Sequence, residues 1–294
     1  MKDPVFTGSA VAIVTPFTES GVDYARLGEL IDWQIDCGSD ALVICGTTGE
    51  SSTQSIPEHL EVVEFAIKKV AGRVPVIAGA GSNDTADALL MSQEAEKAGA
   101  DALLLVTPYY NKTTQAGLIR HYTYLADRVS IPIILYNVPS RTSMSFTAET
   151  YRELSRHPRI NGVKEASGDF SLIARTRFLC GDDLNLWSGN DSEIVPILAM
   201  GGRGVISTMA NVIPRESAAI CRLWREGKIG ESAGLQIKYQ ELIDSLFCEV
   251  NPIPVKTAMG LMGRDCGLLR MPLCDMAPKN LDRLRAAMAE VGLL

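Results

Sequence analysis

The sequence predicts an α/β fold, a (β/α)8 TIM barrel followed by an all-helical C-terminal appendage. Short apolar runs recur from Gly8 to about Gly227, and longer amphipathic segments alternate with them. The runs are rich in Val, Ile and Leu without polar alternation, which suits strands covered on both faces. The predicted strands are residues 9–14, 41–45, 76–80, 102–106, 133–136, 160–164, 184–187 and 204–207. We therefore expect the barrel at residues 1–227 and the helical appendage at residues 228–294.

Helix start signals lie between these runs. Asp23, Asp84, Thr147 and Asp191 each precede a stretch with helical periodicity, as N-cap residues do. A doubly wound open sheet is the structural alternative, but such sheets usually have fewer strands and a glycine-rich first turn. The first turn here, residues 15–17, reads Thr-Pro-Phe and cannot cradle a phosphate. The barrel is the better prediction.

The strand signal ends after Gly227. Residues 229–247 place apolar side chains at helical spacing, and residues 257–262 and 279–291 continue in the same style. We expect this stripe to pack against the core and other subunits rather than to bind a ligand.

Composition excludes several functions. The chain has 294 residues and a net charge of −7, which argues against a nucleic-acid surface. Its seven cysteines lack CxxC spacing and indicate reduced thiols. The N-terminus lacks the apolar stretch of a signal peptide and no run reaches membrane-spanning length, so we expect a soluble, cytoplasmic protein. His59, His121 and His157 show no ligand spacing, and we expect no metal.

Lys164 is the main candidate for a catalytic group. It ends one apolar run, and the active sites of TIM barrels lie at the carboxyl ends of the strands. Only the neutral form of a lysine amine attacks a carbonyl, and an apolar cavity favours that form. The alternative is a lysine that lays its stem on the core and keeps its charge in water.

Further polar groups follow other predicted strands. Thr47 and Thr48 lie between two glycines, where hydroxyl and backbone N–H groups suit a small carboxylate, although turn residues alone explain the pattern. Tyr136 ends the strand before that of Lys164 and is a candidate for proton transfer, although tyrosines at strand ends often only pack. Arg141 can bind a carboxylate through two parallel hydrogen bonds or form a rim salt bridge. Together these residues indicate Schiff-base chemistry on a 2-oxo acid.

Four segments of the chain resemble the dihydrodipicolinate synthase family. They occur in the family's order and at matching intervals, so that the resemblance covers essentially the whole chain. The segments are residues 46–50 (GTTGE), 136–142 (YNVPSRT), 162–168 (GVKEASG) and 251–256 (NPIPVK).

The resemblance implies a reaction and the residues that perform it. Pyruvate would form a Schiff base on Lys164 and condense with L-aspartate 4-semialdehyde to 4-hydroxy-tetrahydrodipicolinate, the first committed step of the diaminopimelate and lysine pathway, without a cofactor. The other implied roles are pyruvate binding by Thr47 and Thr48, with Gly189 and Ile206 lining the pocket; a proton relay of Thr48, Tyr136 and Tyr110; and binding of the semialdehyde carboxylate by Arg141. The resemblance further implies that Tyr110 reaches in from a neighbouring subunit and that the assembly is a homotetramer of two tight dimers.

The resemblance also implies inhibition by L-lysine in a cleft near the Thr47–Thr48 loop. The matching positions are Ser51, Ser52, His59, Asn83, Asp87 and Tyr109. Asp87 stands where a longer glutamate is common, and Ile56 replaces a frequent second histidine.

Two other functions remain open. Another Schiff-base pyruvate aldolase, such as N-acetylneuraminate lyase or a keto-deoxy-sugar aldolase, shares the barrel and the lysine, but Arg141 favours the amino-acid semialdehyde. A non-catalytic barrel that binds a keto acid would have an ordinary, solvated Lys164.

Overall fold

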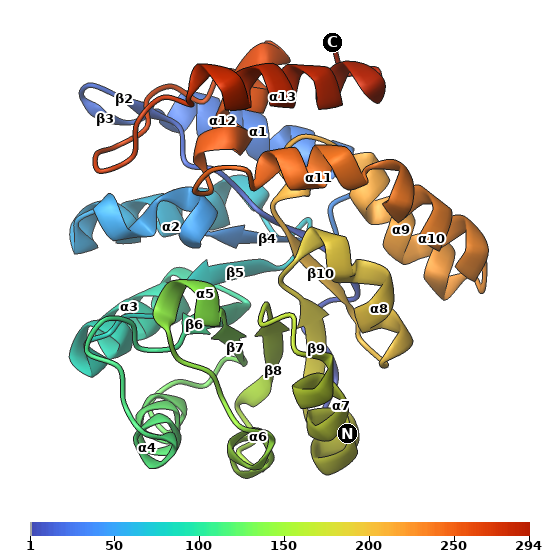
Figure 1. The fold of residues 1–294 in the computed structure, drawn as a ribbon. Helices are drawn as coiled ribbons and strands as arrows, with labels where there is room; N and C mark the ends of the chain where they lie inside the picture. Colours follow the sequence, from blue (N-terminus) through green and yellow to red (C-terminus); the bar gives the residue numbers. More distant parts are fainter. Residues whose placement is uncertain (1) are drawn as a thin grey trace.

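The eight predicted strands form a closed parallel barrel in a computed structural model that describes residues 2–294 (Figure 1). Its strands are β1 (Gly8–Ala12), β4 (Ala41–Ile44), β5 (Val76–Gly79), β6 (Ala102–Val106), β7 (Ile133–Asn137), β8 (Ile160–Glu165), β9 (Asn185–Ser188) and β10 (Gly204–Ser207). They follow the chain around the barrel, which closes where β1 pairs with both β4 and β10. The predicted fold class is confirmed, with each strand end within two residues of its expected position.

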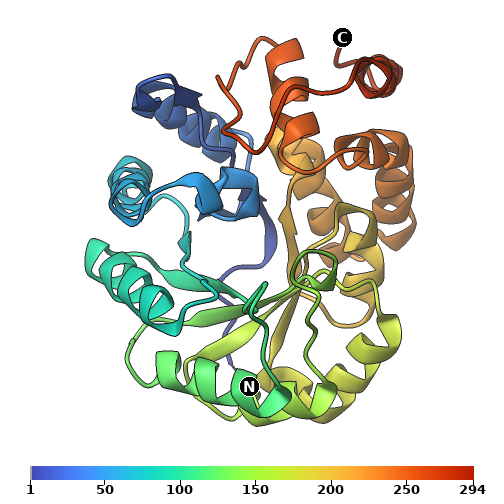
Figure 2. The same cartoon turned by 60° about the vertical axis from the view of Figure 1, so that its left-hand side comes forward.

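Helices alternate with the strands and surround the barrel (Figure 2). They are α1 (Tyr24–Asp36), α2 (Ile56–Val70), α3 (Thr85–Ala98), α4 (Gln115–Ala126), the one-turn α5 (Pro139–Thr142), α6 (Ala148–Ser155), α7 (Phe170–Cys180), α8 (Ile194–Ala199) and α9 (Pro214–Arg225). Asp23, Asp84 and Thr147 accept backbone hydrogen bonds from the first turns of α1, α3 and α6, so these three predicted N-caps are confirmed.

Asp191 is not the N-cap that the sequence predicted. A 3-10 turn, Asp191–Glu193, precedes α8, and no side chain caps that helix. The Asp191 carboxylate instead accepts hydrogen bonds from the backbone N–H groups of Thr208 and Met209 after β10. A sequence pattern cannot show that a carboxylate will be used by a loop that follows another strand.

Two apolar layers stabilise the barrel. The inner layer fills the barrel itself and includes Ile134, Tyr136, Trp187 and Ile206. The larger outer layer lies between the strands and the helices. Burial of these side chains contributes roughly 1.5–3 kcal/mol each for the larger ones and holds the strand ends in a fixed ring.

A register shift in β8 determines which way Lys164 faces. Ile160 and Lys164 are four residues apart and would share one face of a regular strand. The pairing of β7 with β8 shifts by one residue between Ile133 and Ile134, as in a β-bulge. Ile160 consequently packs in the outer layer, whereas Lys164 pairs with Tyr136 and faces the interior with it.

The chain after the barrel is helical, as predicted, but with different helix ends. Its helices are α10 (Ile229–Lys238), α11 (Gln240–Leu246), α12 (Ile253–Leu261) and α13 (Pro278–Glu290). The expected single helix over residues 229–247 is two helices that meet at Tyr239. Helix α10 packs on α8 and α9, and α13 contacts α11 and α12 in the upper part of Figure 1. The boundary at residue 227 stays a prediction.

Two further features complete the fold. A short hairpin, β2 (Phe17–Thr18) and β3 (Gly21–Val22), was not predicted and precedes α1. Within residues 2–294, no helix combines the length and apolar character needed to cross a membrane.

Candidate active site

Lys164 is buried at the carboxyl end of β8. Its side chain is 6% exposed and lines a cavity of about 310 Å³ at this end of the barrel. The Nζ atom lies 4.3 Å from the centre of the Tyr136 ring, so the face of the ring contacts the amine. The solvated lysine that a non-catalytic keto-acid binder would have is therefore not what the structure shows.

A glycine leaves room for the Lys164 side chain. A Cβ atom on Gly189 would lie 3.2 Å from the Cε atom of Lys164 and 2.7 Å from the Cβ atom of Ala166. The second distance is shorter than van der Waals contact allows, so a larger residue would displace its neighbours. Gly189 itself lines the cavity.

The Thr47–Thr48 loop forms one wall of the cavity. Residues Thr47–Gly49 make a 3-10 turn after β4, and both threonines line the space. The Thr48 hydroxyl is buried and accepts a hydrogen bond of 2.9 Å from Nδ2 of Asn251. Its other neighbour is the Thr208 hydroxyl, at 3.5 Å. A hydroxyl that already accepts from an amide keeps its own hydrogen for another group, which suits a proton relay.

Arg141 stands at the mouth of the cavity on the one-turn helix α5. Its Nη2 atom donates a hydrogen bond of 3.3 Å to the backbone oxygen of Asn251. The guanidinium has no salt bridge within residues 2–294 and lines the cavity with Ser140 and Asn190. It is therefore available to bind a carboxylate there.

Asp191 lies behind the site, fully buried. Burial raises the pKa of its carboxyl, and hydrogen bonds from Ser207 and the following backbone, together with the charge of Lys164, act in the opposite direction. One carboxylate oxygen of Asp191 has no partner among the described residues. The acid thus fixes the loop after β10, which carries Thr208.

A buried hydrogen-bond network supports β8 on its outer side. The Glu165 carboxylate accepts from Nδ2 of Asn137 at 2.9 Å and from the Tyr151 hydroxyl at 2.9 Å. Burial raises the pKa of Glu165, and these hydrogen bonds oppose the effect. Because Glu165 follows Lys164 directly, the network holds the end of β8 against α6.

Two predicted site residues lie outside the cavity. Ile206 is fully buried in the inner apolar layer and is not among the residues that line the space. Tyr110 is 93% exposed and does not reach the cavity of its own chain. It has φ of 64°, a left-handed conformation that is uncommon outside glycine.

A second cavity, of about 430 Å³, adjoins the first. Of the residues predicted to bind lysine, Ser51, Ser52, His59, Asp87 and Tyr109 line it. Asn83 does not, but its side chain donates a hydrogen bond to the backbone oxygen of Tyr109. Burial lowers the pKa of His59, and a hydrogen bond to the backbone of Gly79 opposes that shift. Thr47, Val138 and Arg141 border both cavities.

Several site residues were not predicted. Phe247, Glu249, Val250 and Asn251 line the reaction cavity, so the C-terminal helical region contributes to the site as well as to packing. The resemblance of residues 251–256 to the family implies no role for them, and only the closed fold shows that Asn251 reaches Thr48. Thr208 and Asn190 gave no sequence signal beyond their position after a strand.

The fold and the site define a class of enzyme. A buried lysine at the carboxyl end of a TIM-barrel strand, beside hydroxyl donors and a guanidinium, is typical of barrel enzymes that form a Schiff base with a small keto acid. Among residues 2–294, no group of three or more His, Cys, Asp or Glu side chains is placed to hold a metal ion.

Comparison with known proteins identifies the family. The profile of the Dihydrodipicolinate synthetase family matches residues 5–291, and the chain belongs to this family. A 4-hydroxy-tetrahydrodipicolinate synthase from Thermoanaerobacter sp. (strain X514) is 53% identical over 292 residues, which are 99% of this chain and 98% of that protein.

Solved structures agree with this assignment. Dihydrodipicolinate synthase from Cyanidioschyzon merolae with lysine bound has a TM-score of 0.96 and 38% identity, over 99% of this chain and 100% of that one. The chloride-inhibited enzyme from Acinetobacter baumannii complexed with pyruvate has a TM-score of 0.95 and 39% identity, over 98% and 99%. The predicted family is therefore confirmed.

Proposed function

We propose that this chain is a lyase that condenses pyruvate with L-aspartate 4-semialdehyde to give 4-hydroxy-tetrahydrodipicolinate, the first committed step of the diaminopimelate and lysine pathway. The observation that carries the proposal is Lys164, which is buried in a cavity that also contains the Thr47–Thr48 turn and the Arg141 side chain. Family membership supports both substrates, and a pyruvate-bound relative supports the first.

The chemistry starts at the amine. The Lys164 nitrogen attacks the ketone of pyruvate, water leaves, and a C=N bond replaces the C=O bond. The iminium makes the methyl group acidic, so that a proton acceptor converts it to an enamine. Thr48 and Tyr136 line the cavity and are the proposed carriers of that proton, and no cofactor is needed because the iminium itself is the electron sink.

The second substrate enters at the mouth of the cavity. Arg141 binds the carboxylate of the semialdehyde, with its planar fork suited to two parallel hydrogen bonds. The enamine carbon adds to the aldehyde, and the amine of the semialdehyde then displaces Lys164 as the ring closes. Thr47 and Thr48 hold the pyruvate carboxylate, while Gly189 leaves room beside the Lys164 side chain.

Product analysis tests this assignment. Incubation of the enzyme with pyruvate and aspartate semialdehyde should give the cyclic product by NMR, whereas N-acetylneuraminate should not be cleaved. Cleavage of N-acetylneuraminate without turnover of the semialdehyde would instead establish the aldolase. Arg141→Lys is the matched variant: it keeps the charge but loses the fork, and KM for the semialdehyde should rise while KM for pyruvate stays.

We infer that the second cavity binds L-lysine as an inhibitor. Asp87 offers a carboxylate for an ammonium group, and the serines and Tyr109 offer hydroxyls around a space of about 430 Å³. A related enzyme with lysine bound supports this proposal. Millimolar L-lysine should lower the rate, D-lysine should act more weakly, and Asp87→Asn should weaken the response. No effect of L-lysine on the rate would refute it.

We propose a homotetramer in which Tyr110 completes the site of a neighbouring subunit. Tyr110, Tyr109 and Leu90 are exposed large apolar side chains, which supports a contact with a second copy of the chain. Sedimentation analysis tests the assembly, and a monomer with full activity would contradict it. A cytoplasmic location is the matching proposal for a chain whose seven cysteines are all free thiols.

A further inference from the structure

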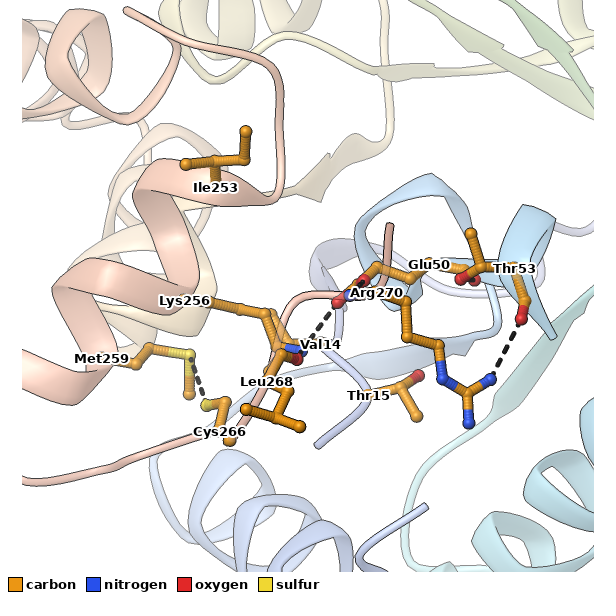
Figure 3. Close-up of polar contacts among 12 residues, drawn as sticks. Val14, Thr15, Glu50, Thr53, Ile253, Lys256, Met259, Cys266, Leu268 and Arg270 are labelled. Carbon is orange, nitrogen blue, oxygen red and sulfur yellow. Dashed lines mark hydrogen bonds and ion pairs between the residues drawn. The ribbon is translucent and has the colours of Figure 1, made fainter. Parts of the chain in front are cut away.

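A buried ion pair joins the C-terminal helix α12 to the loop that carries Thr48 (Figure 3). Nζ of Lys256 lies 2.7 Å from Oε1 of Glu50, and the two side chains are only 3% and 1% exposed. The partners are 206 residues apart in the sequence. Neither of them lines the reaction cavity, so their role in the site must be indirect.

Each charged group of the pair has a second hydrogen-bond partner. Lys256 also donates to the backbone oxygen of Leu268 at 2.7 Å, and the other oxygen of Glu50 accepts from the backbone N–H of Arg270 at 3.0 Å. Burial lowers the pKa of Lys256, and the charge of Glu50 opposes that shift. Its nitrogen is held by two acceptors and Lys256 does not line the reaction cavity, so it is not a second nucleophile.

Stability alone explains this pair poorly. Two buried charges lose much of their hydration, and apolar residues of similar size often stabilise a fold as well or better. A buried ion pair can instead be retained because it fixes one backbone conformation where others are possible. The backbone conformation of Glu50 is of this kind.

Glu50 adopts a left-handed conformation, with φ of 55° and ψ of 36°. For a residue other than glycine this conformation costs roughly 1–2 kcal/mol. It lies between two 3-10 turns, Thr47–Gly49 and Ser51–Thr53. The buried carboxylate, fixed by Lys256 and Arg270, offsets that cost and keeps the first turn in place.

The residues just before α12 also contact the Thr47–Thr48 loop directly. Asn251, just before the helix, donates to the hydroxyl of Thr48, and its backbone oxygen accepts from Arg141. The chain around α12 thus holds the loop at Thr48 and again at Glu50, two residues later.

We propose that Glu50 and Lys256 are positioning residues, which hold the Thr47–Gly49 turn so that the Thr48 hydroxyl can pass protons to and from the pyruvate bound on Lys164. This inference rests on the proposed function. It predicts that loss of the pair slows proton transfer at the pyruvate methyl group without preventing capture of pyruvate by Lys164.

Two measurements separate capture from proton transfer. Borohydride reduction with saturating pyruvate, followed by intact mass, reports the Schiff base on Lys164. Exchange of the pyruvate methyl hydrogens in D2O, followed by NMR without the second substrate, reports proton transfer. Glu50→Gln should retain the adduct and lose about 10- to 100-fold in exchange rate, as displacements near 1 Å do.

A double variant keeps the test independent of folding. Glu50→Gln alone leaves a buried charge on Lys256 and is expected to lower the denaturation midpoint, whereas Glu50→Gln with Lys256→Met removes both charges and should restore it. The exchange rate should stay low in the double variant. If the double variant recovers both the wild-type denaturation midpoint and the wild-type exchange rate, the pair has only a structural role and the proposal is overturned.

A neighbouring ion pair supplies the matched control. Glu58 pairs with the side chain of Arg270 and is partly exposed, and among residues 2–294 it has no hydrogen bond or ion pair with Glu50 or Lys256. Glu58→Gln should exchange like the wild type, and an equal loss there would also overturn the proposal. If the wild type forms no adduct with pyruvate, the proposed function is wrong. If the double variant forms the adduct and exchanges the methyl hydrogens at the wild-type rate, only the positioning role of the ion pair is wrong.

Discussion

Replacement of Thr48 by valine should separate capture of pyruvate from the later proton transfers. Valine keeps the shape of threonine but has no hydroxyl. The Thr48 hydroxyl is buried and accepts from Nδ2 of Asn251, so the substitution leaves that amide hydrogen unpaired. A buried donor without a partner costs about 1–3 kcal/mol of the free energy of unfolding. Loss of a group that transfers protons costs about 10²- to 10⁴-fold in rate.

The assay compares Thr48→Val with Thr48→Ser. Both should form the borohydride-trapped adduct, because Lys164 is unchanged. Serine retains the hydroxyl and should keep most of the turnover rate, whereas valine should lose it. If the two variants turn over pyruvate and semialdehyde at rates within about threefold of each other, the hydroxyl takes no part in proton transfer and the reasoning is refuted.

Other perturbations test separate features of the molecule. Tyr110→Phe and Lys164→Met should each be nearly inactive. If Tyr110 acts across an interface, mixing the two variants should restore about a quarter of the wild-type activity, because half of the dimers are then mixed and one of their two sites has both residues. If native mass spectrometry shows mixed subunits but activity does not recover, Tyr110 does not act across an interface. Gly189→Ala should slow formation of the adduct, because its Cβ atom would crowd the Lys164 side chain; wild-type kinetics would show that the site has room to spare. Burial lowers the pKa of His121 to about 4, whereas in the unfolded chain it is about 6.5. The unfolded chain therefore binds the proton first as the pH falls, and the free energy of unfolding should decrease by up to about 3 kcal/mol between about pH 6.5 and pH 4. Denaturation of His121→Gln should show a weaker loss over that range, and equal pH dependence would contradict the prediction.

Much of the fold could be predicted from the sequence because barrel strands have a strong local signal. Strands covered on both faces are continuous apolar runs, and the expected strands at residues 102–106 and 204–207 agree with β6 and β10 at both ends. Helix starts were predicted where the capping residue bonds to its own helix, as at Asp84. Asp191 was misassigned because its carboxylate bonds to a distant loop.

Candidate site residues could be predicted only where a residue's position at the end of a strand determines where it lies. Lys164 and Tyr136 end neighbouring strands, and the pairing of β7 with β8 places them opposite each other. Lys164 faces inward with Tyr136 only because of the register shift near Asn161, which no local pattern reveals. Asn251 and Lys256 could not be assigned, because their roles arise from contacts with residues about 200 positions earlier.

The measurement that tests the central claim most directly is reductive trapping with pyruvate. Borohydride added to enzyme and pyruvate should raise the intact mass by about 72 Da, which is pyruvate less water plus two hydrogens. Peptide mapping should place the added mass on Lys164 alone, and Lys164→Met should remove it. An unmodified wild-type protein, or an adduct on the buried but paired Lys256, would contradict the account.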